Sequence, residues 1–121
     1  MSKYVDAVEK ALADFKKDTK IPYYFERFDG DEKKLPDTYA VWFLVSSSSA
    51  SSADGKERLR TLKVQFSLFY RKKKTFLTIP EKLVNKLTEN GFRQSNEGRI
   101  PYQQNTGHYG WRSDFIFLEK R

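Results

Sequence analysis

Apolar residues near the N-terminus recur with the period of an α-helix. Between residues 3 and 17 they fall on one stripe of a helix with about 3.6 residues per turn. The stripe consists of Tyr4, Val5, Val8, Ala11, Leu12 and Phe15. Ser2 is a candidate N-cap and Pro22 ends the pattern, so the sequence predicts a helix over residues 3–17.

A second helix is predicted over residues 79–90. Its apolar stripe consists of Ile79, Leu83, Val84 and Leu87. Thr78 and Glu81 have the spacing of a capping box, and Pro80 would lie in the first turn, where its missing N–H costs little. The Asn-Gly pair at the end of this stretch is a typical helix stop.

Three other segments favour β-strands. Residues 23–28 are rich in aromatic side chains, and residues 39–45 form a continuous apolar run, which indicates a strand covered on both faces. Residues 57–71 alternate, and the apolar face of this alternation consists of Leu62, Val64, Phe66, Leu68 and Tyr70. This segment is longer than an ordinary strand, so we expect it to bend or to form a hairpin arm that projects beyond the core.

Residues 46–55, between the last two predicted strands, include six serines and no large apolar side chain. Such a segment has little to bury, which predicts a flexible hairpin loop. The alternative is a segment that becomes ordered when it binds a neighbouring subunit or a partner.

The remaining pattern completes a sheet. Residues 92–104 contain two short polar strand candidates, residues 105–110 form a glycine-containing turn, and residues 111–119 form a final apolar strand. We therefore predict a single α+β domain over residues 1–121, in the order α-β-β-β-α-(ββ)-β. Its sheet is mostly antiparallel, with both helices on one face.

Charge is concentrated in one part of the chain. The 121 residues include 23 Lys and Arg against 16 Asp and Glu, which gives a formal net charge of +7. Residues 56–74 hold eight cations and only one carboxylate, Glu57, and so carry the whole imbalance. The eight cations are Lys56, Arg58, Arg60, Lys63, Arg71, Lys72, Lys73 and Lys74.

The residue inventory argues against most catalytic and cofactor chemistry. The chain has no Cys and a single His, His108, which excludes disulfides, a thiol nucleophile and the usual zinc sites. Asp29, Asp31 and Glu32 lack the spacing of a calcium loop, and no glycine-rich phosphate loop occurs. We therefore expect no enzyme activity, no cofactor and no metal. No signal-peptide pattern or membrane-spanning run is present either, so we expect no membrane partner and synthesis in the cytoplasm.

The basic segment has two interpretations. Aromatic residues interleaved with cations suit nucleic acid, through phosphate contacts and base stacking. Alternatively, the lysines protect an edge strand from aggregation.

Several short motifs resemble a known family. Ala53-Asp54-Gly55-Lys56 leads into a strand that ends Leu68-Phe69-Tyr70-Arg71-Lys72-Lys73-Lys74, and Asn105-Thr106-Gly107-His108-Tyr109 precedes the apolar last strand. Together with the length and the order of elements, these motifs resemble the tail-completion proteins, or tail terminators, of long-tailed bacteriophages and prophages. After the lysines, this chain has Phe76-Leu77 and a Pro where acidic residues are expected.

The resemblance implies a structural protein of the virion tail or neck, assembled in the host cytoplasm. Such proteins form a ring, typically sixfold, on the head-proximal end of the tail tube, which stops tube growth and joins the tail to the head. The implied partners are other copies of the chain, the major tail tube protein, a head-completion (neck) protein and DNA passing through the lumen. The implied interface or lumen residues are Ser48, Asp54, Lys56, Arg58, Arg60, Lys63, Tyr70, Arg71, Lys72, Lys73 and Lys74, with the loop 46–55. The alternative function is a small basic nucleic-acid-binding module.

Overall fold

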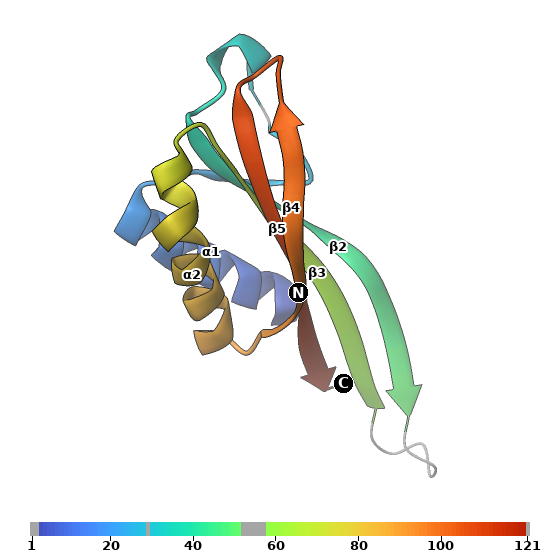
Figure 1. Cartoon of the computed structure of the whole chain (residues 1–121). Helices are drawn as coiled ribbons and strands as arrows, with labels where there is room; N and C mark the ends of the chain where they lie inside the picture. Colours follow the sequence, from blue (N-terminus) through green and yellow to red (C-terminus); the bar gives the residue numbers. More distant parts are fainter. Residues whose placement is uncertain (1–2, 29, 52–57, 121) are drawn as a thin grey trace.

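The computed structural model describes residues 3–28, 30–51 and 58–120, in which it places two long helices, one short 3-10 helix and five strands (Figure 1). In chain order they are α1 (Lys3–Thr19), β1 (Tyr23–Phe25), η1 (Glu32–Lys34), β2 (Thr38–Ser51), β3 (Arg58–Tyr70), α2 (Lys73–Glu89), β4 (Arg93–Gln103) and β5 (His108–Lys120). The fold is α+β, as the sequence predicts. The candidate N-cap Ser2 lies outside the described residues.

The strands form one sheet in the order β1-β2-β3-β5-β4. β1 runs parallel to β2, and the other neighbouring pairs are antiparallel, which confirms a mostly antiparallel sheet. β3 is central and pairs with β2 and β5 along almost its whole length. β1 and β4 are therefore the two edges of the sheet.

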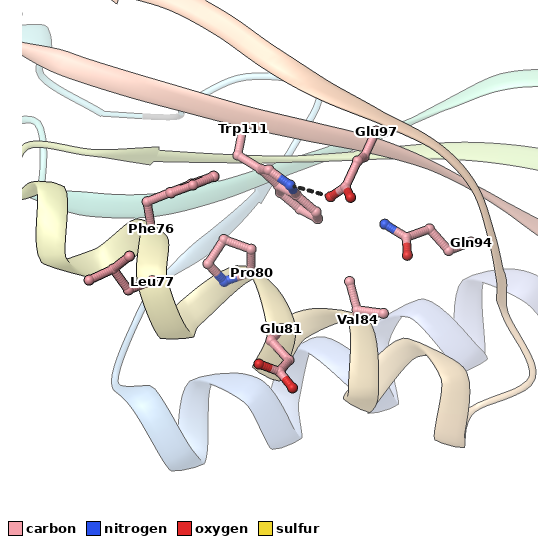
Figure 2. Close-up of a pocket in the computed structure, with 8 residues that line it drawn as sticks. All are labelled: Phe76, Leu77, Pro80, Glu81, Val84, Gln94, Glu97 and Trp111. Atoms are coloured by element: carbon pink, nitrogen blue, oxygen red, sulfur yellow. Dashed lines mark hydrogen bonds between the residues drawn. The ribbon is translucent and has the colours of Figure 1, made fainter.

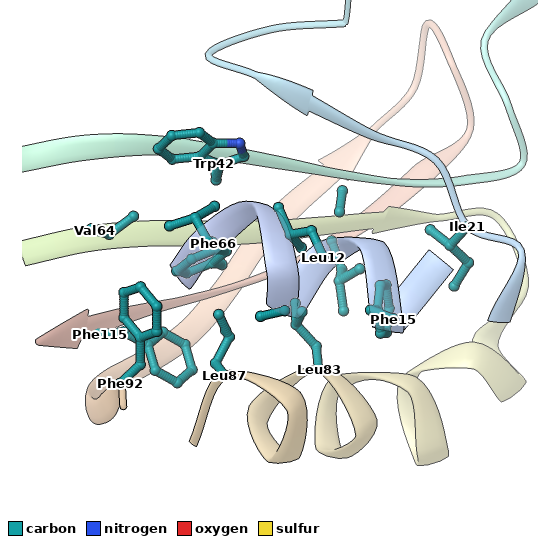
Figure 3. Close-up of a cluster of buried hydrophobic side chains, with 14 of the residues drawn as sticks. Leu12, Phe15, Ile21, Trp42, Val64, Phe66, Leu83, Leu87, Phe92 and Phe115 are labelled. Carbon is teal, nitrogen blue, oxygen red and sulfur yellow. The ribbon is translucent and has the colours of Figure 1, made fainter. Parts of the chain in front are cut away.

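Both helices cover one face of the sheet, as predicted (Figure 1). The apolar stripes of α1 and α2 point toward the sheet and meet the inward face of β3 (Figure 3). The predicted alternation of β3 is confirmed, because its inward side chains are all fully or almost fully buried. The main core residues are Val8, Leu12, Phe15, Trp42, Leu62, Val64, Phe66, Leu68, Tyr70, Leu83, Leu87, Phe92, Trp111 and Phe115.

The serine-rich segment differs from its prediction. β2 continues through Ser51, and the backbone of residues 46–51 pairs with β3 from Lys63 to Arg58 after an irregularity beside Leu44. The predicted flexible loop is therefore wrong for residues 46–51, and residues 52–57 lie outside the described part. Ladder hydrogen bonds come from the backbone, so a serine run can extend a strand when a strong partner strand lies beside it.

The extended ends of three strands form a projecting arm. It consists of residues 46–51 of β2, residues 58–63 of β3 and residues 116–120 of β5, which pair with one another. The arm extends past the ends of the helices (Figure 1). This is the projecting hairpin that the length of the predicted strand indicated. The last β-strand supports one side of it.

The start of α2 also differs from its prediction. The helix begins at Lys73, so Pro80 lies inside the helix, and the capping box at Thr78 is wrong. Lys72 is the N-cap and makes no side-chain cap hydrogen bond. Pro80 predicted a helix start close to it, but packing favours the additional helical turn, because Phe76 stacks on Tyr70 with 6.2 Å between ring centroids.

The predicted end of α2 is confirmed. Gly91 has φ +91°, a conformation that glycine adopts readily. The Phe92 N–H donates to the Leu87 carbonyl at 3.0 Å and the Gly91 N–H to the Thr88 carbonyl at 3.2 Å. This pair of bonds is a Schellman motif, and it turns the chain from α2 into β4.

Three strand boundaries are corrected. Residues 93–103 form a single strand with two register shifts, in place of two short ones, because β5 is long enough to pair with the whole segment. β5 begins at His108, inside the predicted turn, and β1 ends at Phe25. The chain leaves β1 through Glu26, whose φ of +68° interrupts an extended backbone.

Candidate assembly surfaces

The structure divides the basic segment between the two ends of β3. Arg58, Arg60 and Lys63 belong to the arm, whereas Lys73 and Lys74 open α2 at the opposite end. Seven residues of β3, from Val64 to Tyr70, lie between Lys63 and the end of the strand, which at about 3.3 Å per residue is roughly 23 Å. The net charge of +7 therefore does not form one continuous patch.

The arm presents hydroxyl groups and cations outside the helical layer. Ser48 is exposed, Lys63 is half-buried, and the Arg60 Nε donates to the Ser47 Oγ at 2.8 Å across the two strands. Of Arg58 the structure describes the backbone alone. The other predicted interface residues of this segment, Asp54 and Lys56, lie outside the described residues.

Arg71 connects three segments of the chain. Its Nη1 donates to the Asp37 carboxylate at 2.8 Å and to the Leu35 carbonyl at 3.3 Å, and its Nε donates to the Thr106 carbonyl at 3.0 Å. The same guanidinium lowers the pKa of Asp37 below its ordinary value. Arg71 therefore ties the end of β3 to the β1–β2 connection and to the β4–β5 turn.

Lys73 and Lys74 lie in the first turn of α2, which contains no acidic residue. The positive end of a helix dipole favours anions, so two lysines there create a strongly cationic spot. Nearby, the Arg99 guanidinium lies over the Phe76 ring at 4.7 Å, and the Lys73 ammonium lies 5.9 Å from the centre of the Tyr109 ring.

These side chains surround a cavity of about 540 Å³, which we call the basic cavity. It is lined by Tyr70, Lys73, Lys74, Phe76, Leu77, Arg99 and Tyr109. The Tyr70 ring is stacked between Phe76 and Tyr109, and its hydroxyl is buried without a hydrogen-bond partner among the described residues. The cavity thus combines aromatic walls, three cations and a free phenol.

A second cavity, of about 300 Å³, continues from the first along α2; we call it the α2–β4 groove (Figure 2). Phe76 and Leu77 line both cavities. The Trp111 indole N–H donates to the Glu97 carboxylate at 2.9 Å on the sheet side of the groove. The rest of its lining is Pro80, Glu81, Val84 and Gln94.

The sequence predicts only part of the basic cavity. Tyr70, Lys73 and Lys74 are among the predicted interface residues, but Arg99 and Tyr109 are not, because pairing through β5 brings them to the same place. One feature of the sequence pointed to this cavity: the apolar pair Phe76-Leu77 after the lysines, where the chain differs from the tail-terminator pattern.

His108 is part of a buried structural contact. It is fully buried, and its Nε2 lies 2.9 Å from the Pro36 carbonyl, so Nε2 must carry the proton and donate. Its ring packs edge-on against Tyr39 on the helix-free face of the sheet. In the described part of the chain, no group of three His, Asp or Glu side chains could hold a metal ion.

No family model matches this chain, and no curated protein matches it. Neither long helix of the described part has the length and apolar character required to cross a membrane. The surfaces described above define a small α+β protein with an arm, two free sheet edges and a cationic aromatic cavity.

Proposed function

We propose that this chain is a structural protein that acts by self-assembly, as a tail-completion protein of a long-tailed bacteriophage or prophage. In this proposal, copies form a ring at the head-proximal end of the tail tube. The ring stops tube growth and joins the tail to a head-completion protein. The protein is then a component of the virion tail and neck, with DNA passing through the lumen.

The observation that carries the proposal is the arm. Strand segments that project beyond the helical layer leave the outer backbone and polar side chains available to a neighbouring molecule. Two free sheet edges, β1 and β4, add further surfaces for association. Surfaces on opposite sides of one molecule suit head-to-tail contacts, which give a ring when the rotation closes.

The test is assembly with and without a phage tail tube protein. Size-exclusion chromatography with light scattering and negative-stain microscopy should show rings, or tubes that are capped and shortened. Arg60→Glu/Lys63→Glu should reduce capping, whereas Lys10→Glu/Lys17→Glu on the exposed side of α1 should not. A monomer that neither caps tubes nor binds a neck protein would overturn the proposal.

The second candidate function, a nucleic-acid-binding module, rests on the cations and aromatic rings of the basic cavity. It predicts binding of single-stranded or duplex DNA that weakens steeply with salt and that Lys72→Glu/Lys73→Glu/Lys74→Glu abolishes. The separation of the basic segment into two groups, with Arg71 bound within the chain, counts against one extended phosphate-binding surface. No gel shift at low salt would remove this candidate.

A further inference from the structure

The β4 edge of the sheet runs beside both cavities. β4 is the last strand of the sheet, and no strand of the described part pairs with its outer side. Arg99 lines the basic cavity, and Glu97, two residues earlier on the same strand, lines the α2–β4 groove. Alternate residues of a strand share one face, and two residues span about 7 Å. An extended chain beside β4 would therefore reach both cavities with side chains that are two positions apart.

The backbone of this edge suits an added strand. Residues 96–100 pair with β5 between two register shifts, so this stretch is regular. Asn96, Glu97 and Arg99 are exposed, and no helix or loop of the described part covers the outer side of the strand. Pro101 has no amide hydrogen, so it ends the stretch that can donate to a new neighbour.

The helix side of the groove is apolar. Phe76 and Leu77 lie where the groove meets the basic cavity, and they line both (Figure 2). Leu77 is 74% exposed, although it is a large aliphatic side chain. Pro80 and Val84 continue this lining along α2. An apolar side chain that covered these residues would remove apolar surface from water, which favours binding.

The basic cavity selects a negative charge. Its lining contains Lys73, Lys74 and Arg99 and no carboxylate, and none of these three cations forms a salt bridge within the described residues. Tyr70 in its wall is 1% exposed, and its hydroxyl has no hydrogen-bond partner among the described residues. An acceptor oxygen on a ligand would provide that partner. The cavity therefore fits a carboxylate.

The groove beside the cavity carries the opposite charge, which separates two classes of ligand. Glu81 and Glu97 line it, and Glu97 also accepts the indole N–H of Trp111. A nucleic-acid strand has a phosphate at every nucleotide, so a strand that continued from the cavity into the groove would meet these carboxylates. A peptide can place a single carboxylate in the cavity and an apolar side chain in the groove. The charge pattern thus favours a peptide.

We propose that the β4 edge and the two cavities bind an extended segment of another protein. The segment adds to residues 96–100 as a further edge strand, a mode known as β-augmentation. It places an Asp or Glu side chain in the basic cavity and an apolar side chain, two positions away, against Leu77 and Pro80 in the α2–β4 groove. This inference goes beyond the proposed function, because it requires neither a ring nor a tail tube.

A synthetic peptide tests the site. The probe is acetyl-Thr-Leu-Thr-Glu-Thr-Leu-Thr-amide, whose side-chain pattern is the same in both chain directions, so parallel and antiparallel addition are both covered. Titration into the full chain, followed by amide NMR shifts, should give saturable changes in residues 96–100 and 73–77. Replacing Glu by Lys, or both Leu by Ala, should weaken binding at least about tenfold.

Variants of the protein test the same contacts from the other side. Lys74→Glu/Arg99→Glu should lose the Glu peptide and gain the Lys peptide, a reversal that an unfolded variant cannot produce. Lys10→Glu/Lys17→Glu, with the same charge change on α1, should bind like the wild type. If the first variant has lost its fold, the peptide series on the wild type decides the matter.

N-methylation of the peptide tests strand addition itself. Alternate residues of an edge strand direct their amide hydrogens to the neighbour. Methylating either the Thr residues or the Leu and Glu residues should therefore abolish binding for one set and spare the other. Equal effects of the two sets would overturn strand addition.

Three other results would refute the proposal. One is no shift change with about 1 mM peptide, and another is equal binding of the Glu and Lys peptides. The third is tighter binding of a thymidine oligonucleotide that Lys74→Glu/Arg99→Glu abolishes, which would assign the cavity to nucleic acid. Shift changes at residues 96–100 on raising the concentration of the protein alone would assign the edge to a second copy and also refute it.

Discussion

The Tyr70 hydroxyl offers a direct test of the cavity, through the substitution Tyr70→Phe. The ring is only 1% exposed, stacked between two other aromatic rings, and would keep these contacts in the variant. The substitution removes a single oxygen atom, which has no hydrogen-bond partner among the described residues. The change therefore isolates the cost of burying that oxygen in the free chain.

The expected effect is stabilisation. A buried hydroxyl without a partner costs about 1–3 kcal/mol, and water reaching the cavity from its open side reduces this cost. We expect the variant to gain about 1 kcal/mol in the free energy of unfolding. For a chain of 121 residues this corresponds to a rise of about 4 °C in Tm.

The same substitution should change the alkaline stability. Burial raises the pKa of Tyr70 above its ordinary value of 10.0, so the unfolded chain loses this proton first as the pH rises. The free energy of unfolding of the wild type should therefore fall above pH 10.0, and Tyr70→Phe should lessen that fall. Tyr39, whose pKa burial also raises, accounts for part of the remainder.

Urea unfolding followed by circular dichroism, at neutral pH and above pH 10.0, measures both effects. Tyr102→Phe is the matched control, because that tyrosine is exposed. A loss of about 1 kcal/mol or more in Tyr70→Phe would refute the reasoning, since it would mean that the hydroxyl has a favourable partner in the free chain.

Three further substitutions test the fold. Leu83→Ala should lower the free energy of unfolding by about 2–5 kcal/mol in urea, because Leu83 is fully buried, while Leu77→Ala on the same helix should have little effect. Gly91→Ala should cost about 1 kcal/mol in the same assay, because φ is +91° there; an unchanged midpoint would contradict this. Asp37→Asn should lower stability at neutral pH. Because Arg71 lowers the Asp37 pKa, this contribution is present above pH 3.8 and disappears as the pH falls through the lowered pKa. Acid titrations of wild type and variant should therefore converge, and a constant difference would refute it.

The hydrophobic pattern predicted what depends on burial. The α1 stripe, the alternation of β3 and the Asn-Gly stop after α2 were all correct, because each reflects a local rule that the core reinforces. The predictions that failed concerned segments with little apolar content or with mixed signals. Residues 46–51 extend β2 as a strand paired with β3, and the helix that contains Pro80 starts at Lys73, before Phe76, which packs on Tyr70.

The candidate site was predictable only in part for a similar reason. Lys73 and Lys74 were identified from composition, but the significance of Arg99 depends on β4 pairing with β5 beside the end of β3. Pairings between distant segments cannot be deduced from a single sequence. Tyr23 and Arg99 lie in the same row of paired residues across the sheet. That relation depends on the register of all five strands, and no local sequence pattern contains it.

The proline inside α2 has a consequence for the kinetics of local opening. Pro80 has no amide hydrogen, so the Phe76 carbonyl loses its usual partner and the helical hydrogen-bond ladder is interrupted there. The turns before this break carry Phe76 and Leu77, while the turns after it carry the fully buried Leu83 and Leu87. Amide hydrogens of residues 75–79 should therefore exchange with solvent faster than those of residues 83–87, which open only with the core. The wall of the cavity can then adjust its shape at little cost while the rest of the helix holds the fold.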